Sequence, residues 1–154
     1  MIATFTLMAD FGCFGWCHHG PEDEANPALG SGIWDGSYWN EKYDVIDDDL
    51  RRDLCVWHSR FEKGSVWNHE AACQFDWASF HAEGVALCRR LKFAFGSDVR
   101  VRYEKPAEDP DCGDRDVMQI EVDGTVAPVP WDHELDKQRW AEFAEEIRRQ
   151  LEAD

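Results

Sequence analysis

Four side chains near the start of the chain could ligate a metal ion. Residues 10–24 read DFGCFGWCHHGPEDE, in which two cysteines four residues apart precede two histidines. Zinc is usually held by thiolates and imidazoles, and a structural site needs four ligands, commonly as two short-spaced pairs. The remaining cysteines are isolated in the sequence, so no second pair is evident. Packing of this stretch against a core is therefore favoured. The alternative is a small zinc-binding module or metal-dependent enzyme centred on Cys13, Cys17, His18 and His19.

A second stretch, residues 69–73, imitates a zinc motif. It reads HEAAC, which is the H-E-x-x-H pattern with cysteine in the last position. No third ligand is evident, so the stretch is interpreted as the approach to a helix. The sequence has no P-loop, G-x-S-x-G or G-x-G-x-x-G motif, and its carboxylates show no spacing typical of an acid–base pair. We expect a protein that is not an enzyme and that needs no cofactor.

Aromatic residues alternate with acids in a third stretch, residues 33–49. Large rings beside carboxylates suit an interface whose partner supplies arginine and lysine. Burial of the same rings beneath a loop that folds over the core is an equal alternative. The residues expected to bind a partner are Trp34, Asp35, Tyr38, Trp39, Glu41, Tyr43, Asp44, Asp47, Asp48 and Asp49.

The charge of the chain restricts its partners. There are 32 Asp and Glu against 16 Lys and Arg, a formal net charge of −16. Phosphates would repel such a protein, which argues against direct binding to nucleic acid or to an anionic membrane. The acids concentrate in residues 22–53, 104–123 and 132–154, around a nearly balanced middle segment. This distribution favours a basic protein partner, such as a nuclease or a CRISPR effector, although a solvated acidic surface would have the same composition.

These features lead to a functional hypothesis of inhibition. Carboxylates can occupy a groove in which a basic protein normally holds phosphates, because both pair with Arg and Lys. DNA-mimic anti-CRISPR and other anti-defence proteins act in this way, and so do immunity proteins that neutralise nuclease toxins. The sequence does not choose between these settings. It contains no apolar run of membrane-spanning length and no secretory signal, so a cytoplasmic location is expected.

Three helices are predicted from periodicity and capping residues. Residues 47–61 carry an apolar stripe, with aspartates at the start and Gly64 after the end. Residues 76–95 follow a potential Asp76 cap and stop at Gly96, and Gly84 within them suggests a close approach by a neighbouring element. A final helix begins near residue 133, with four apolar residues expected to face inward: Trp140, Phe143, Ile147 and Leu151.

Strands are predicted at residues 2–8, 99–103 and 117–122, with an edge arm at 125–129 limited by prolines. Residues 9–46 are expected to be irregular because glycines and prolines interrupt them. Together these elements predict an α+β fold in one domain, residues 1–154. It would be a small two-layer sandwich, with a mostly antiparallel sheet and about three helices.

Three segments resemble a family of small, acidic, uncharacterised bacterial proteins. Residues 80–103 (FHAEGVALCRRLKFAFGSDVRVRY) resemble its central helix–strand unit, and residues 50–62 (LRRDLCVWHSRFE) resemble its preceding helix. Residues 8–20 (MADFGCFGWCHHG) are similar to its opening. The resemblance implies a shared fold unit and no mechanism, because no activity is established for that family.

Overall fold

The computed structural model describes residues 3–18, 32–37, 41–112, 116–130 and 133–152. Within these ranges, side chains are not described at residues 17–18, 32–33 and 41–42, nor at several positions between 133 and 147.

In this part of the chain, six strands form one mixed sheet in the order β3-β2-β1-β4-β5-β6. The strands β1 and β4 are parallel, and the other neighbouring pairs are antiparallel. The predicted α+β fold with a mostly antiparallel sheet is therefore confirmed. The strands are β1 (Ala3–Asp10), β2 (Cys13–His18), β3 (Gly32–Trp34), β4 (Val99–Glu104), β5 (Val117–Ile120) and β6 (Val126–Val129).

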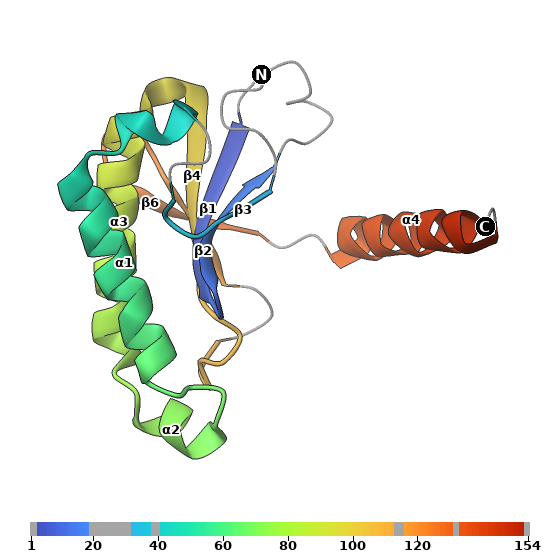
Figure 1. Cartoon of the computed structure of the whole chain (residues 1–154), viewed down its shortest axis with the longest axis horizontal. Coiled ribbons are helices and arrows are strands. Elements are labelled where there is room, and N and C mark those ends of the chain that lie inside the picture. Colours follow the sequence, from blue (N-terminus) through green and yellow to red (C-terminus); the bar gives the residue numbers. More distant parts are fainter. Residues whose placement is uncertain (1–2, 19–31, 38–40, 113–115, 131–132, 153–154) are drawn as a thin grey trace.

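Two long helices cover one face of this sheet. Figure 1 shows α1 (Asp48–Lys63) and α3 (Trp77–Phe95) side by side, with the short α2 (His69–Gln74) at one end of the pair. The last helix, α4 (His133–Glu152), lies apart from the sheet on its other side. The 3-10 turns η1 (Glu41–Val45) and η2 (Gly96–Asp98) precede α1 and follow α3. Within the described ranges, no helix combines the length and apolar character needed to cross a membrane.

The ends of α1 and α3 form as their sequences predict. Asp47 accepts a hydrogen bond from the backbone N–H of Leu50 at 2.7 Å, and Asp76 accepts one from Ser79 at 3.1 Å. Each carboxylate satisfies a donor that the first helical turn leaves free. Gly96 ends α3 with φ 73°, a conformation that costs glycine little. The predicted stripe on α1 is buried in the core: Leu50, Leu54, Trp57 and Phe61.

Gly84 allows α3 to approach the sheet closely. A Cβ atom at this position would collide with the ring of Tyr103 on β4 and would lie 3.1 Å from the ring of Trp57 on α1. The close approach predicted from a glycine inside a helix is therefore confirmed. It lets Trp57 stack on Phe80 with ring centroids 4.6 Å apart, while the indole N–H donates to the Phe80 carbonyl at 3.0 Å.

The prediction that residues 9–46 are irregular is wrong. Residues 13–18 form β2, which pairs with the central strand β1, and residues 32–34 form β3. Gly15 weakened the strand signal, yet the packing requires a residue without a side chain here. A Cβ atom on Gly15 would lie 2.9 Å from the ring of Phe5 and 3.1 Å from that of Trp34. Long-range pairing and ring packing therefore override the local glycine signal.

The inward-facing stripe predicted for the last helix is not confirmed. Leu151 is exposed, because α4 lies apart from the sheet. The side chains of the other three predicted residues, Trp140, Phe143 and Ile147, lie outside the described part of the structure.

Candidate functional site

The aromatic residues of the predicted interface belong to the core. Trp34 and Tyr43 are completely buried, and their rings stack with centroids 4.7 Å apart and planes inclined by 12°. Phe5 on the central strand β1 packs edge-on against both rings. The interpretation of Trp34 and Tyr43 as surface anchors is therefore wrong, because neither ring can reach a partner without unfolding of the core.

A buried arginine holds this segment against α1. The Arg51 guanidinium donates to the carbonyls of Gly36, Tyr43 and Ile46 at 3.0, 3.1 and 3.2 Å. It also lies 5.7 Å from the centre of the Trp34 ring, a cation–π distance. The fork of guanidinium donors satisfies carbonyls that a buried loop would otherwise leave unpaired. This arginine therefore has a structural role.

The described acids of the same stretch are at the surface. Asp35, Asp44, Asp47, Asp48 and Asp49 are all exposed. Asp35 accepts a hydrogen bond from the Ser37 N–H at 2.9 Å, and bonding to Ser37 lowers the pKa of this carboxyl. Asp47 combines exposure with its capping role. The structure does not describe Tyr38 or Trp39, nor the side chain of Glu41.

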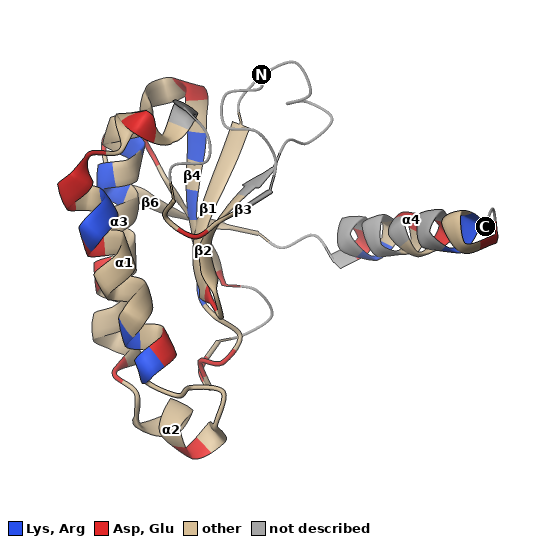
Figure 2. Cartoon of the chain, viewed as in Figure 1, with Lys and Arg blue, Asp and Glu red and all other residues tan. Residues whose placement is uncertain are grey.

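Two exposed apolar side chains share the end of the helix layer where these acids lie. Val45 in η1 is 54% exposed, and Phe93 near the C-terminal end of α3 is 93% exposed. The ring of Tyr43 packs against that of Phe95 at 6.3 Å, which places η1 beside this end of α3. Figure 2 shows acidic residues at the start of α1, at the same end. We call these exposed residues at one end of the helix layer the acidic corner: Asp44, Val45, Asp48, Asp49 and Phe93. Phe93 lies on the outer face of α3, turned away from the contact between Tyr43 and Phe95.

The helical periodicity of α3 is a sequence signal for the exposure of Phe93. The buried stripe of α3 includes Phe80, Leu87 and Leu91. Phe93 lies on the opposite face of the helix, because each residue advances about 100° around the axis. A large ring on the polar face of an amphipathic helix is exposed, and such residues are candidates for contact with a partner.

Several bases are already paired with acids across the helix layer. Arg90 on α3 binds Asp53 on α1 at 2.6 Å, and Arg60 on α1 binds Glu83 on α3. Each such pair neutralises one acid and one base. Pairing therefore leaves the net charge of −16 unchanged. Within the acidic corner, Asp49 is itself paired with Arg52 at 3.0 Å, and both side chains are largely exposed.

The alternative zinc site does not fit the backbone. Cys13 is buried at the start of β2, and burial raises the pKa of its thiol. Cys17 lies four residues further along the same strand, or about 13 Å at ~3.3 Å per residue. Two thiolates at ~2.3 Å from one zinc ion cannot be so far apart. The side chains of Cys17 and His18 are not described, and His19 lies outside the described residues. No group of three or more potential ligands occurs elsewhere in the described ranges.

A buried network of hydrogen bonds links α3, β4 and the loop that follows β4. The His81 imidazole lies with Nδ1 2.7 Å from the Tyr103 hydroxyl and Nε2 2.6 Å from Asp109 Oδ2. Since a carboxylate only accepts hydrogen bonds, Nε2 carries the proton in its bond to Asp109, and Nδ1 shares the second hydrogen bond with the Tyr103 hydroxyl. The Trp77 ring stacks over His81 at 5.6 Å. No local sequence pattern predicts these hydrogen bonds, because the three residues are distant in sequence.

The hydrogen bonds among His81, Tyr103 and Asp109 fasten the loop that follows β4 to the helix layer. Asp109 is 5% exposed, and its other oxygen accepts from the Asp111 N–H at 2.9 Å. Lys105 binds Asp116 at 2.6 Å across the base of the loop. Tyr103 is fully buried and burial raises its pKa, so its hydroxyl stays neutral and available as a donor. Because the Tyr103 hydroxyl and the Asp109 carboxylate are both buried, these hydrogen bonds have a structural role and hold the loop in place.

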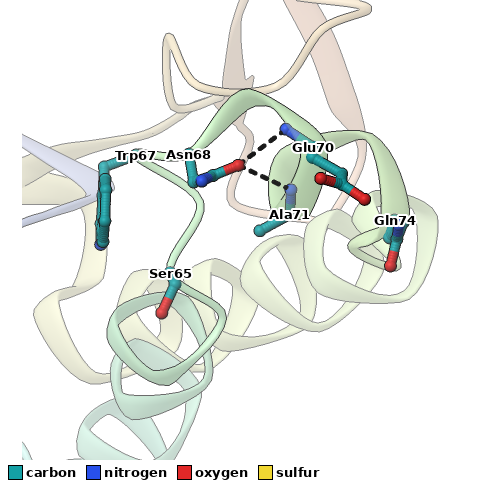
Figure 3. Close-up of a pocket in the computed structure, with 6 residues that line it drawn as sticks. All are labelled: Ser65, Trp67, Asn68, Glu70, Ala71 and Gln74. Atoms are coloured by element: carbon teal, nitrogen blue, oxygen red, sulfur yellow. Dashed lines mark hydrogen bonds between the residues drawn. The ribbon is translucent and has the colours of Figure 1, made fainter.

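The surface beside α2 is hollowed. The residues drawn in Figure 3 line an open hollow, whose volume is about 370 Å³. Among them, Asn68 caps α2 by accepting hydrogen bonds from the backbone N–H groups of Glu70 and Ala71. Trp67 on the rim of the hollow is 71% exposed. A second hollow of about 430 Å³ lies on the other side of α2 and is lined in part by Cys73, Asp76, Trp77 and Asp111.

Searches among protein families, curated proteins and solved structures find no match for this chain. The resemblance to the family of small acidic bacterial proteins therefore stays a prediction.

Proposed function

We propose that this protein is a non-enzymatic, acidic inhibitor that blocks a basic, nucleic-acid-handling protein and binds it through the acidic corner. The observation that carries the proposal is the combination of exposed carboxylates with exposed Val45 and Phe93 at one end of the helix layer. The surplus of 16 negative charges supplies a long-range attraction toward a basic partner.

The acids and the apolar side chains have different tasks in this proposal. Asp44, Asp48 and Asp49 present carboxylates that pair with arginine and lysine as phosphates do. Surface charges of this kind mainly raise the association rate. A ring that becomes buried in a partner mainly lowers the dissociation rate, and Phe93 takes the anchoring role that the sequence assigned to Trp34 and Tyr43.

The proposed inhibitor suits two biological settings. An anti-CRISPR or other anti-defence protein would cover the groove in which an effector binds nucleic acid. An immunity protein would cover the corresponding groove of a nuclease toxin. In both settings the complex forms in the cytoplasm without membrane or metal, and bound nucleic acid competes with the inhibitor.

Competition with DNA tests the proposal directly. The full chain is immobilised and exposed to a nuclease-treated lysate of the cells that encode it. We expect it to retain a basic nucleic-acid-binding protein, which added duplex DNA releases. The triple variant Asp44→Asn, Asp48→Asn, Asp49→Asn should bind the purified partner with a slower association rate and a weaker salt dependence, because three steering charges are gone.

A matched control variant tests whether the position of the replaced acids matters, or only the change in net charge. Replacing three exposed acids elsewhere, Glu70→Gln, Asp111→Asn and Glu121→Gln, removes the same charge and should slow association much less. Phe93→Ala should raise the dissociation rate. The corresponding loss of binding free energy should be about 2 kcal/mol if the ring is a buried anchor. Retained proteins that DNA does not displace, or equal effects of the two triple variants, would show that the proposal is wrong.

A further inference from the structure

The short helix α2 places two zinc-type donor atoms next to each other. His69 Nε2 and Cys73 Sγ are 3.7 Å apart, one helical turn from each other. In a tetrahedral zinc site with Zn–S ~2.3 Å, Zn–N ~2.05 Å and an angle of ~109°, the sulfur and nitrogen atoms lie about 3.6 Å apart. The observed separation therefore matches that of two ligands bound to one ion.

We propose that His69 and Cys73 form a two-ligand site for zinc or a similar divalent metal ion. Zinc is a divalent ion of intermediate softness, and its preferred protein ligands include imidazole and thiolate. Both residues are exposed, so a metal ion can reach them without rearrangement of the core. This site differs from the stretch at the start of the chain, whose two cysteines are too far apart along β2 to share an ion.

The surroundings favour a cation. Asp76 and Asp111 line the hollow beside Cys73. Carboxylates near a metal ion lower its energy by direct electrostatic attraction. No third ligand joins the pair among the described residues. Two positions of a tetrahedral ion therefore remain for water, one more than in a catalytic zinc site with three protein ligands.

Binding has a defined proton balance and a structural consequence. The metal ion displaces the thiol proton of Cys73 and takes the neutral imidazole of His69, so binding releases protons and weakens as the pH falls. The ion joins the first and fifth residues of a six-residue helix. It should therefore raise the thermal stability of the protein, since a ligand that binds only the folded state stabilises that state.

Cobalt(II) is a suitable probe, because a thiolate bound to it gives a charge-transfer absorption in the near ultraviolet. The full chain, freed of metal with a chelator and kept reduced by a phosphine, is titrated with cobalt. We expect this absorption to saturate at one ion per chain, to disappear when zinc is added and to be accompanied by a rise in melting temperature. No saturable absorption would overturn the proposal.

Five variants locate the site. Cys73→Ser and His69→Ala should abolish the absorption and the rise in melting temperature. Cys73→His should keep the rise but lose the absorption, because two imidazoles one turn apart still chelate a metal ion. Cys55→Ser, at an exposed cysteine on α1, and Cys17→Ser, at the start of the chain, should change nothing. Absorption that persists in Cys73→Ser, or is lost in Cys17→Ser, would place the metal elsewhere and overturn the proposal.

Discussion

At the scale of single residues, the contact between Gly84 and Tyr103 shows how one absent methyl group determines the distance between two layers. The helix α3 lies so close to β4 that a Cβ atom at residue 84 would overlap the tyrosine ring. The hydroxyl of the same tyrosine forms a hydrogen bond with Nδ1 of His81 at 2.7 Å. Its ring therefore sets the separation of the two layers, and its hydroxyl joins them.

Replacing Gly84 with alanine should destabilise the protein. Alanine favours a helix by about 1 kcal/mol over glycine, but overpacking of a tight core costs about 1–3 kcal/mol and should prevail here. Urea denaturation measures the difference. In a Tyr103→Leu background the smaller side chain leaves room, so the same substitution should cost less. An equal cost in both backgrounds would contradict this explanation.

The stability of the protein should fall at alkaline pH in a way that depends on Tyr103. Burial raises the pKa of this phenol above its usual value of 10.0. The stabilisation is complete below the unfolded pKa and is lost as the pH rises above about 10, since only the unfolded chain then releases the proton. Each unit of pH in this range removes up to about 1.4 kcal/mol.

The variant Tyr103→Phe should lack this part of the pH dependence. At neutral pH it should lose about 1 kcal/mol of stability with the hydrogen bond to His81. Urea denaturation between neutral pH and pH about 11 measures both effects. Identical alkaline slopes for the two proteins would show that Tyr103 does not cause the decline.

At the scale of elements, helices and loops are held by residues at their ends. Asp47 begins α1, Asp76 begins α3, and the buried Asp109 fastens the loop between β4 and β5 to His81. These acids are structural, so the excess of acid in the sequence is not uniformly available to a partner.

Two substitutions of Asp47 should measure how much the N-cap of α1 contributes to the stability of the protein. Asp47→Ala should cost about 1 kcal/mol of unfolding free energy, whereas Asp47→Asn should cost little, because asparagine caps a helix as well as aspartate does. Thermal melts of both variants check this. The exposed neighbour Asp44 is a control, since Asp44→Ala should change stability by less than about 0.5 kcal/mol.

The loop of residues 105–116 should loosen when the hydrogen bond between Asp109 and His81 is removed. Asp109→Ala leaves Nε2 of His81 without its acceptor, a loss of about 1–3 kcal/mol for a buried group. The backbone of the loop should then be cleaved faster in limited proteolysis. Asp111→Ala is the matched control, because that side chain is exposed. Equal cleavage of the two variants would mean that Asp109 does not hold the loop.

At the scale of the whole molecule, the charge asymmetry is the main guide to a partner. Of the seven bases in residues 54–103, the five between residues 89 and 102 do not form one surface. Lys92 is buried and donates to the Val99 carbonyl at 2.6 Å, and Arg90 is paired with Asp53. Arg100 and Arg102 lie on the sheet face away from the helices, because their alternate neighbours on β4 fill the core. The remaining base, Arg89, donates to the Gly124 carbonyl.

We therefore expect no binding to duplex DNA. Phosphate contacts need clustered free bases, and the net charge of −16 opposes approach. A gel shift at low salt, where electrostatic binding is strongest, is the most demanding measurement. A tight complex under those conditions would mean that the separated arginines act together. It would also remove the basis for an inhibitor that competes with DNA.

The local features of the fold could be predicted from the sequence. The apolar stripes, the capping aspartates and the glycines after α1 and α3 are read from neighbouring residues, and the structure has these elements as predicted. The alternation in β4 likewise predicted a half-buried strand, and Pro128 predicted an edge strand at β6. Such predictions succeed because periodicity and capping depend on residues within a few positions of each other.

Which residues are available for function depends instead on how distant elements pack together. Trp34 and Tyr43 lie in a polar, glycine-bearing segment that looks like a surface loop, yet Arg51 and the central strand enclose them. His81 meets Asp109 from 28 positions away. In contrast, His69 and Cys73 are close in sequence, but their donor atoms lie together only because the chain forms a helix there. Burial and convergence depend on which distant elements pack together, and no local pattern records that.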